Sequence, residues 1–238
     1  MKKILPIFFA LILGCGQPEN QPVVNHAGAL KNFMHKGDIS AKKLLIELKN
    51  KSNLYALGAL ENLKGEILIW DSQPIITFEQ NEHMTFDSTF NKNAALLVWA
   101  QVDRWQSIAI PEEIKTSRQM EKFIESAAKQ AGLNTNQPFP FLLSGTLSSL
   151  HWHIINWPEN DNVHTHQKHR DSGPHGELSN VTCDILGFYS NRHHAIFTHH
   201  TTNMHLHFKS PDQKLAGHID EFLPGSPMVL KLPLYRSK

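Results

Sequence analysis

The stretch MHLHF at residues 204–208 decides how the second half of the chain folds. Successive side chains of a strand point to opposite faces, so His205 and His207 project together while the apolar residues beside them face the core. The run Ser-Pro-Asp-Gln at 210–213 predicts a turn that brings His218 back alongside this strand. Three converging imidazoles leave a coordination position open, as in catalytic zinc sites. Histidines exposed on a strand are the alternative explanation.

Histidine is concentrated in this half of the chain. The sequence has 16 histidines, and only three of them lie outside the range from His151 to His218. Histidine is the commonest metal ligand and titrates near neutral pH, so the clustering favours a metal site.

A polar region at residues 156–178 is interrupted by Pro158 and Pro174, which predicts a long loop. Such a histidine-rich run is commonly a solvated loop, but it could also cover the site as a lid or hold a weak second metal. Its histidines are His164, His166, His169 and His175.

Apolar periodicity predicts two helices. Three leucines at helical spacing indicate one over residues 40–50. Thr116 and Gln119 have the spacing of a capping box, which starts a second helix that ends at Gly132. Both apolar stripes are best explained as core contacts.

Most of the remaining chain has the pattern of strands, which makes the fold class α+β. Residues 66–70 and 75–78 are apolar runs separated by Asp-Ser-Gln-Pro, which predicts a hairpin. Further strands are expected at 94–102, 139–143, 150–155, 185–189, 195–201 and 204–209.

Residues 1–14 have the pattern of a lipoprotein signal peptide, with two lysines before an apolar stretch too short to span a bilayer. Ile12-Leu13-Gly14-Cys15 resembles a lipobox, in which Cys15 would be acylated. A plain secretory signal followed by a coincidental cysteine is the alternative. We therefore expect an exported protein in the bacterial cell envelope that contacts the membrane through its lipid anchor only.

The mature chain is expected to have two parts, a flexible tether at 15–36 and a metal-binding domain at 37–238. The start of the tether is rich in Gln, Asn, Pro and Gly. With Cys15 lipidated, Cys183 is the only other cysteine, which excludes an internal disulfide and a cysteine metal site.

Composition excludes several functions. Apolar residues make up 40% and charged residues 19% of the chain, and its formal net charge is +1. These values are typical of a globular protein and offer no basic stripe for nucleic acid. The sequence has neither a glycine-rich phosphate loop nor a G-x-S-x-G nucleophile motif.

The histidine pattern resembles that of the acetolactate decarboxylase family, in which H-x-H-F is followed by a short loop and G-G-H. Here His205, His207 and His218 stand at that spacing, with Ala-Gly before His218. Gly187-Phe188 is similar to a pair that the family carries upstream, and Gly65-Glu66 is similar to part of its D-G-E segment. The resemblance extends from about residue 37 to residue 222, with its elements in the same order.

The resemblance implies an α+β fold with mixed, barrel-like sheets in two lobes and one zinc ion per chain between them. It implies that His205, His207 and His218 bind the zinc and that Glu66 reaches the metal site. The implied reaction is decarboxylation of 2-acetolactate, or of a related small 2-hydroxy-3-oxo acid, to give acetoin. It also implies a homodimer.

The sequence departs from the family at the catalytic side chains. His153 stands where the family has an arginine that helps to hold the substrate carboxylate, and it lacks arginine's permanent charge and fork of donors. A glutamate that the family carries well beyond the last zinc ligand has no expected counterpart before Lys238. We expect Glu66 or His153 to protonate carbon, and one of His199 and His200 to lie in the shell around the metal.

Two other functions are compatible with these patterns. The protein could be an envelope lipoprotein that binds zinc or copper through its histidine-rich loop without catalysis. It could also be a family member that has changed its substrate or serves only as a scaffold.

Overall fold

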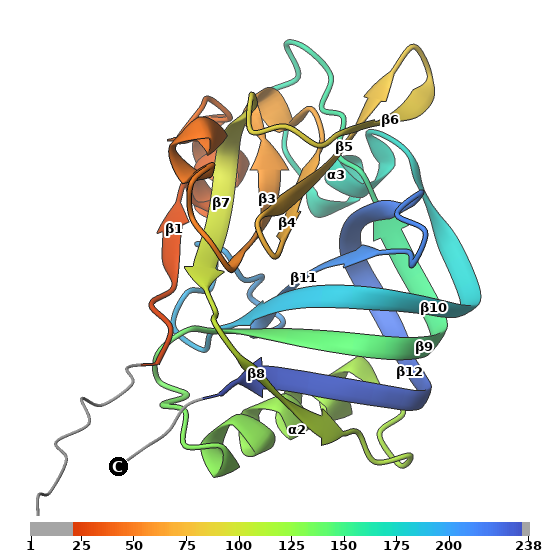
Figure 1. The fold of residues 1–238 in the computed structure, drawn as a ribbon. Helices are drawn as coiled ribbons and strands as arrows, with labels where there is room; N and C mark the ends of the chain where they lie inside the picture. The colour runs from red at the N-terminus through yellow and green to blue at the C-terminus, as the bar shows by residue number, and fades with distance from the viewer. Residues whose placement is uncertain (1–20, 235–238) are drawn as a thin grey trace, which may run out of the picture.

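The protein is described by a computed structural model that covers residues 21–234 (Figure 1). The expected signal peptide at 1–14 and the lipidation site Cys15 lie outside these residues. Among the helices of the described part, none has the length and apolar character needed to cross a bilayer.

The first half of the chain forms a seven-stranded antiparallel sheet (Figure 1). Its strand order is β1-β7-β3-β4-β5-β6, and β2 pairs with β7 beside β1. The strands are β1 (Asn25–Ala27), β2 (Lys43–Leu44), β3 (Leu54–Leu60), β4 (Glu66–Trp70), β5 (Gln73–Gln80), β6 (His83–Asp87) and β7 (Asn93–Gln101). The short helices in this half are α1 (Leu30–Lys36) and the 3₁₀ helices η1 (Leu45–Leu48) and η2 (Glu61–Leu63).

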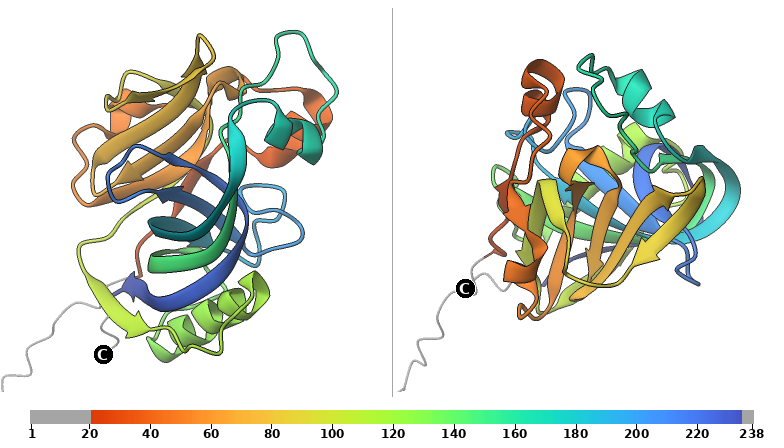
Figure 2. Two further views of the ribbon diagram at one scale, coloured as in Figure 1. Left: turned by 90° about the vertical axis from the view of Figure 1, so that its right-hand side faces the viewer. Right: turned by 90° about the horizontal axis from the view of Figure 1, so that it is seen from above.

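The second half forms a five-stranded sheet in the order β11-β10-β9-β12-β8. Its strands are β8 (Trp105–Ala109), β9 (Phe139–His153), β10 (His175–Tyr189), β11 (Met204–Lys209) and β12 (Ala216–Pro233). Because β11 also pairs with β12, the sheet curls back on itself (Figure 2). The described strand pairs in both sheets are antiparallel, where the resemblance implied mixed sheets.

The two sheets pack against each other, and α2 (Ser117–Gln130) covers the outer face of the second (Figures 1 and 2). Met120 and Ile124 of α2 are fully buried in the core of the second sheet. Between the sheets, Leu57 and Leu68 of the first share a core with Phe188 of the second. A ligand site formed by residues of both sheets can therefore be held rigidly.

Several expected elements are confirmed. Strand β11 has the expected bounds, and its Leu206 and Phe208 face the core as predicted. Helix α2 begins after the capping box, in which the side chains of Thr116 and Gln119 each bond to the other residue's backbone. Strands β4 and β5 form the expected hairpin around a shorter turn.

The expected tether is wrong for residues 25–36, which belong to the folded domain. Strand β1 pairs with β7, and the side chain of Phe33 in α1 is 2% exposed. The helix expected over 40–50 is also wrong, because this segment follows the edge of the first sheet. Lys42 N–H donates to the Ala94 carbonyl, β2 pairs with β7, and only η1 is helical.

The second half differs from expectation in three segments. Residues 195–201 form a compact loop instead of a strand, because three successive N–H groups, at 196–198, turn back to the His193 carbonyl. The expected loop at 156–178 contains helix α3 (His166–Asp171) and the start of β10. The strands expected at 139–143 and 150–155 are one continuous strand, β9, because β10 pairs along its whole length.

Candidate metal centre

Three histidines from two neighbouring strands converge on the face of the second sheet that looks toward the first. His207 of β11 stands directly opposite His218 of β12, and His205 lies two residues from His207 on the same face. The ring centroids of the three imidazoles are 5.1–5.3 Å apart in each pair. One ligand nitrogen from each lies within 4.8 Å of the other two. The sequence pattern therefore produces the predicted cluster.

Burial keeps these imidazoles uncharged. His207 is fully buried and His205 is 7% exposed. Burial lowers the pKa of His205 to about 3, and it lowers the pKa values of His207 and His218 well below the usual range. Neutral imidazole is the form that binds metals, so the cluster is ready to bind a cation at neutral pH.

The cluster fits a divalent cation. Both ring nitrogens of His207 are buried without a hydrogen-bond partner, although a buried polar atom normally has one. Nitrogen ligands of a tetrahedral zinc ion lie about 3.3–3.5 Å apart, given Zn–N bonds of about 2.0–2.1 Å. Small side-chain adjustments would bring the three nitrogens to that spacing, and a bound ion would satisfy the orphaned Nε2.

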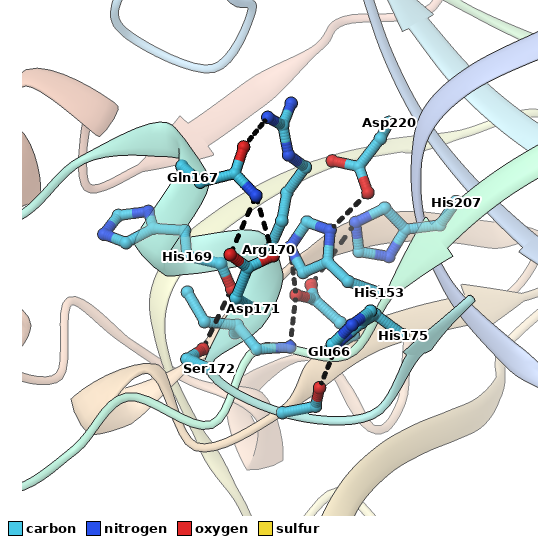
Figure 3. A network of polar contacts seen from close by, with 12 residues as sticks. Glu66, His153, Gln167, His169, Arg170, Asp171, Ser172, His175, His207 and Asp220 are labelled. Carbon is cyan, nitrogen blue, oxygen red and sulfur yellow. Dashed lines mark hydrogen bonds and ion pairs between the residues drawn. The ribbon is translucent and has the colours of Figure 1, made fainter. Parts of the chain in front are cut away.

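Glu66 reaches this cluster from the opposite sheet (Figure 3). Its Oε2 lies 3.5 Å from Nε2 of His207, and its Oε1 accepts a hydrogen bond from the N–H of Ile155 at 3.2 Å. Gly65 permits this placement, because it has a φ of 141° and a Cβ there would lie 2.4 Å from the Thr77 carbonyl oxygen. The resemblance pointed to Glu66, and the structure brings it to the histidines.

The surroundings of Glu66 favour the protonated form of its carboxyl. Burial raises its pKa well above the usual range, the N–H of Ile155 opposes the rise, and the charge of Asp220 adds to it. A cation bound to His207 would lower this pKa again. Glu66 is thus a group that can hold or release a proton beside the cluster.

His153 lies between two carboxyl groups. Its Nε2 is 3.8 Å from Oε1 of Glu66, and its Nδ1 donates to Oδ2 of Asp220 at 2.9 Å (Figure 3). His153, which the resemblance places at the family's arginine position, is therefore at the site, 7% exposed and with its ring 4.9 Å from that of His218.

Asp220 was not expected at the site. The pairing of β12 with β9 shifts between Ile219 and Glu221, so Asp220 is the extra residue of a β-bulge. Bulges redirect side chains, and here the bulge presents Asp220 to His153. The spacing of two residues from His218 was a signal for a shared face, but the bulge itself left no mark in the sequence.

A cavity of about 1130 Å³ opens beside these groups. Its walls include Glu66, His153, His205 and His218, together with the basic side chain of Arg170 from α3. The cavity is large enough for a small organic acid, and the metal cluster and the proton-bearing groups face the same space.

The remaining histidines are divided between the cavity and the surface. His199 lines the cavity, whereas His200 is exposed, so His199 is the one that faces the site. His199 contacts His166 of α3, with its Nε2 at 2.8 Å from Nε2 of His166. Burial lowers the pKa of His199 to about 4.

The other histidines of 156–178 have separate roles. The ring of His164 stacks on Trp157, and its Nδ1 lies 2.9 Å from Nε2 of His169. His175 lines the cavity at the start of β10. This segment thus forms part of the cavity wall, which agrees with the expectation that it could cover the site as a lid.

Comparison with known proteins identifies the family. The sequence matches the model of the alpha-acetolactate decarboxylase family over residues 25–229. No match is found among curated protein sequences.

Three solved structures share the fold at low sequence identity. Alpha-acetolactate decarboxylase from Bacillus subtilis strain 168 is 16% identical with a TM-score of 0.68, over 88% of this chain and 84% of that one. Acetolactate decarboxylase from Bacillus subtilis subspecies spizizenii is 16% identical with a TM-score of 0.70, over 90% and 86%. A Staphylococcus aureus protein described as similar to alpha-acetolactate decarboxylase is 15% identical with a TM-score of 0.66, over 88% and 84%. Because the family match covers most of the sequence, this chain belongs to the alpha-acetolactate decarboxylase family.

Proposed function

We propose that the protein is a zinc-dependent carboxy-lyase that converts 2-acetolactate, or a related small 2-hydroxy-3-oxo acid, to acetoin or its analogue. The observation that carries this proposal is the convergence of His205, His207 and His218 with Glu66 beside one cavity, whose wall includes His205, His218 and Glu66. The family membership supports the reaction class.

A zinc ion held by the three histidines would act as a Lewis acid toward the substrate's hydroxyl and carbonyl oxygens. Breaking the bond to the carboxylate releases carbon dioxide and leaves the electron pair in an enediolate. A proton must then reach carbon. The buried Glu66 carboxyl, whose pKa is raised, is the group that we propose delivers this proton.

His153 is proposed to orient the substrate and Glu66. Its Nδ1 is fixed by Asp220, so Nε2 faces Glu66 and the cavity. Arg118 and Arg170 also line the cavity and offer positive charge to a carboxylate. His153, Arg118 and Arg170 are therefore the candidates for holding the substrate carboxylate, the role that the family gives to an arginine.

The test is acetoin formation from racemic acetolactate by the zinc-loaded protein lacking residues 1–15. We expect turnover that is abolished in His207→Ala and retained in His83→Ala, since His83 is an exposed residue of β6. Zinc binding at the triad without turnover of acetolactate or of longer 2-hydroxy-3-oxo acids would contradict the proposal. That result would favour a metal-binding protein without catalysis, for which a second histidine cluster, formed by His166, His199 and His200, is the supporting observation.

We also propose that the protein is exported and anchored in the envelope through an acylated Cys15, on the basis of the lipobox-like sequence. The full-length protein should fractionate with membranes and incorporate labelled fatty acid, and Cys15→Ser should abolish both. Unchanged membrane association and labelling in Cys15→Ser would contradict the anchor.

A further inference from the structure

We propose a second divalent-cation site, formed by His166, His199 and His200, where α3 meets the loop that precedes β11. One ligand nitrogen from each of the three residues lies within 4.8 Å of the other two. None of the three belongs to the His205, His207 and His218 cluster, so the site is separate from the proposed catalytic centre and does not depend on it.

The three rings already have the spacing of a ligand set. Nε2 of His199 lies 2.8 Å from Nε2 and 3.0 Å from Nδ1 of His166. The ring centroids of His166 and His199 are 4.0 Å apart, and His200 lies 4.6 Å from His199 and 5.9 Å from His166. Opening the shortest contact to about 3.3–3.5 Å would give the nitrogen spacing of a tetrahedral zinc ion. This change needs only side-chain rotation at residues that are not buried.

The ligand from α3 is anchored independently of the loop. The side chain of Thr165 caps the helix by accepting a hydrogen bond from the N–H of Lys168 at 3.1 Å. The segment is also attached to the core, since His164 stacks on the buried Trp157 at 4.3 Å, and within the segment Lys168 pairs with Asp161 at 2.7 Å. His166 is therefore presented toward the loop by contacts that do not involve His199 or His200.

The loop that carries the other two ligands is anchored to α2. The backbone N–H of Asn203 donates to Oε2 of Glu121 at 3.0 Å, and its side-chain amide donates to Oε1 at 2.9 Å. Thr202 also donates to Glu121, at 2.5 Å. Two segments far apart in sequence and fixed to different elements thus meet at an all-imidazole cluster.

An all-imidazole site selects borderline cations such as Zn²⁺, Cu²⁺ or Ni²⁺ over Mg²⁺ or Ca²⁺. Arg170 lies close enough to repel positive charge at His166 and His199, and the ligands are partly exposed, so this site should be weaker than the buried one. His166 and His199 both line the cavity. A bound cation would therefore join α3 to the loop along the cavity wall and restrain this part of the wall.

Equilibrium dialysis of the folded protein against Zn²⁺ tests the site. We expect two ions per chain in the unaltered protein and one in each of His166→Ala and His207→Ala, with none in the double variant. His175→Ala is the matched control, because His175 also lies in the 156–178 segment and lines the cavity but is outside the cluster. It should bind two ions.

Hydrogen exchange gives a second readout that does not depend on activity. In His207→Ala, Zn²⁺ should slow exchange at the amides of 166–171 and 198–203. Adding His166→Ala to this variant should abolish the protection. Failure of His207→Ala to bind an ion would overturn the second site, as would unchanged binding and protection in His166→Ala. Neither result would contradict the triad, whose ion is measured by the loss of one ion in His207→Ala relative to the unaltered protein.

Discussion

Asp220 accepts a hydrogen bond from Nδ1 of His153 at 2.9 Å, which leaves Nε2 of His153 facing Glu66 at 3.8 Å. A carboxylate that binds one ring nitrogen selects the tautomer and orientation of the imidazole. The bulge in β12 places Asp220, and Asp220 in turn orients the His153 ring toward Glu66 of the opposite sheet.

Asp220→Asn should lower kcat about 10- to 100-fold while zinc content stays unchanged, because the amide keeps the shape but loses the charge that holds the His153 tautomer. Acetoin formation across a pH series, with zinc measured on the same samples, checks this. Asp71→Asn is the matched control, since Asp71 lies in the β4–β5 turn and outside the cavity. Equal activities of the two variants would contradict the role of Asp220.

Glu66→Gln should reduce turnover about 10²- to 10⁴-fold, the range for loss of a group that transfers a proton. The amide oxygen can still accept from the N–H of Ile155, so the fold and zinc binding should survive. Glu113→Gln, at an exposed position before α2, is the control for the same chemical change. Near-normal turnover in Glu66→Gln would show that the proton comes from another group.

His207→Ala should weaken zinc binding at the triad by at least about 10²-fold, because only two of its three imidazole ligands remain. Competition with a zinc chelator measures this. His194→Ala, at an exposed position of the loop before β11, should leave the affinity unchanged. Similar affinities in both variants would mean that zinc is held elsewhere.

The site was predictable where it depends on alternation along a single strand. The period of two in β11 places His205 and His207 on one face, and the short turn returns His218 opposite His207. The capping box likewise defines the start of α2. Strand alternation and helix capping depend on neighbouring residues, and the tertiary packing of these segments is compatible with both.

Expectations were wrong where tertiary contacts override local pattern. The leucine spacing at 40–50 is helical, yet backbone bonds to β7 and to the Lys92 carbonyl hold residues 42–45 beside the sheet and leave only the short η1 helical. The polar composition near the start of the expected tether gave no sign of β1. This strand is stabilised by its backbone pairing with β7, a contact between distant segments. Asp220 was missed because a bulge depends on the partner strand, which the sequence does not show.

Gly187→Ala should destabilise the fold by about 1–3 kcal/mol, as overpacking of a core does. Gly187 stands opposite Phe141 in the β9–β10 pair, and a Cβ there would lie 2.2 Å from the Phe141 ring. Urea unfolding measures the loss. Phe141→Leu in the same chain should recover part of the stability by removing the clash, and failure to do so would place the strain elsewhere.

Lowering the pH should destabilise the metal-free protein between about pH 6.5 and pH 3. Burial lowers the pKa of His205 and His169 to about 3 in the folded chain, whereas the unfolded value is 6.5. Between these values the unfolded chain binds protons that the folded chain does not, so the free energy of unfolding falls as the pH falls. The raised pKa of Glu66 acts in the opposite direction only above its ordinary value of 4.5, where the unfolded chain has lost the proton that the folded chain keeps.

The decrease should therefore be steepest below about pH 4.5, where Glu66 no longer opposes it. Urea unfolding in the presence of a chelator at a series of pH values measures the slope. His205→Asn should flatten it, because the variant has no buried imidazole at that position to protonate on unfolding, and His83→Asn, on the exposed start of β6, should not. Parallel curves for the unaltered protein and His205→Asn would show that acid destabilisation arises from the carboxylates instead of the buried histidines.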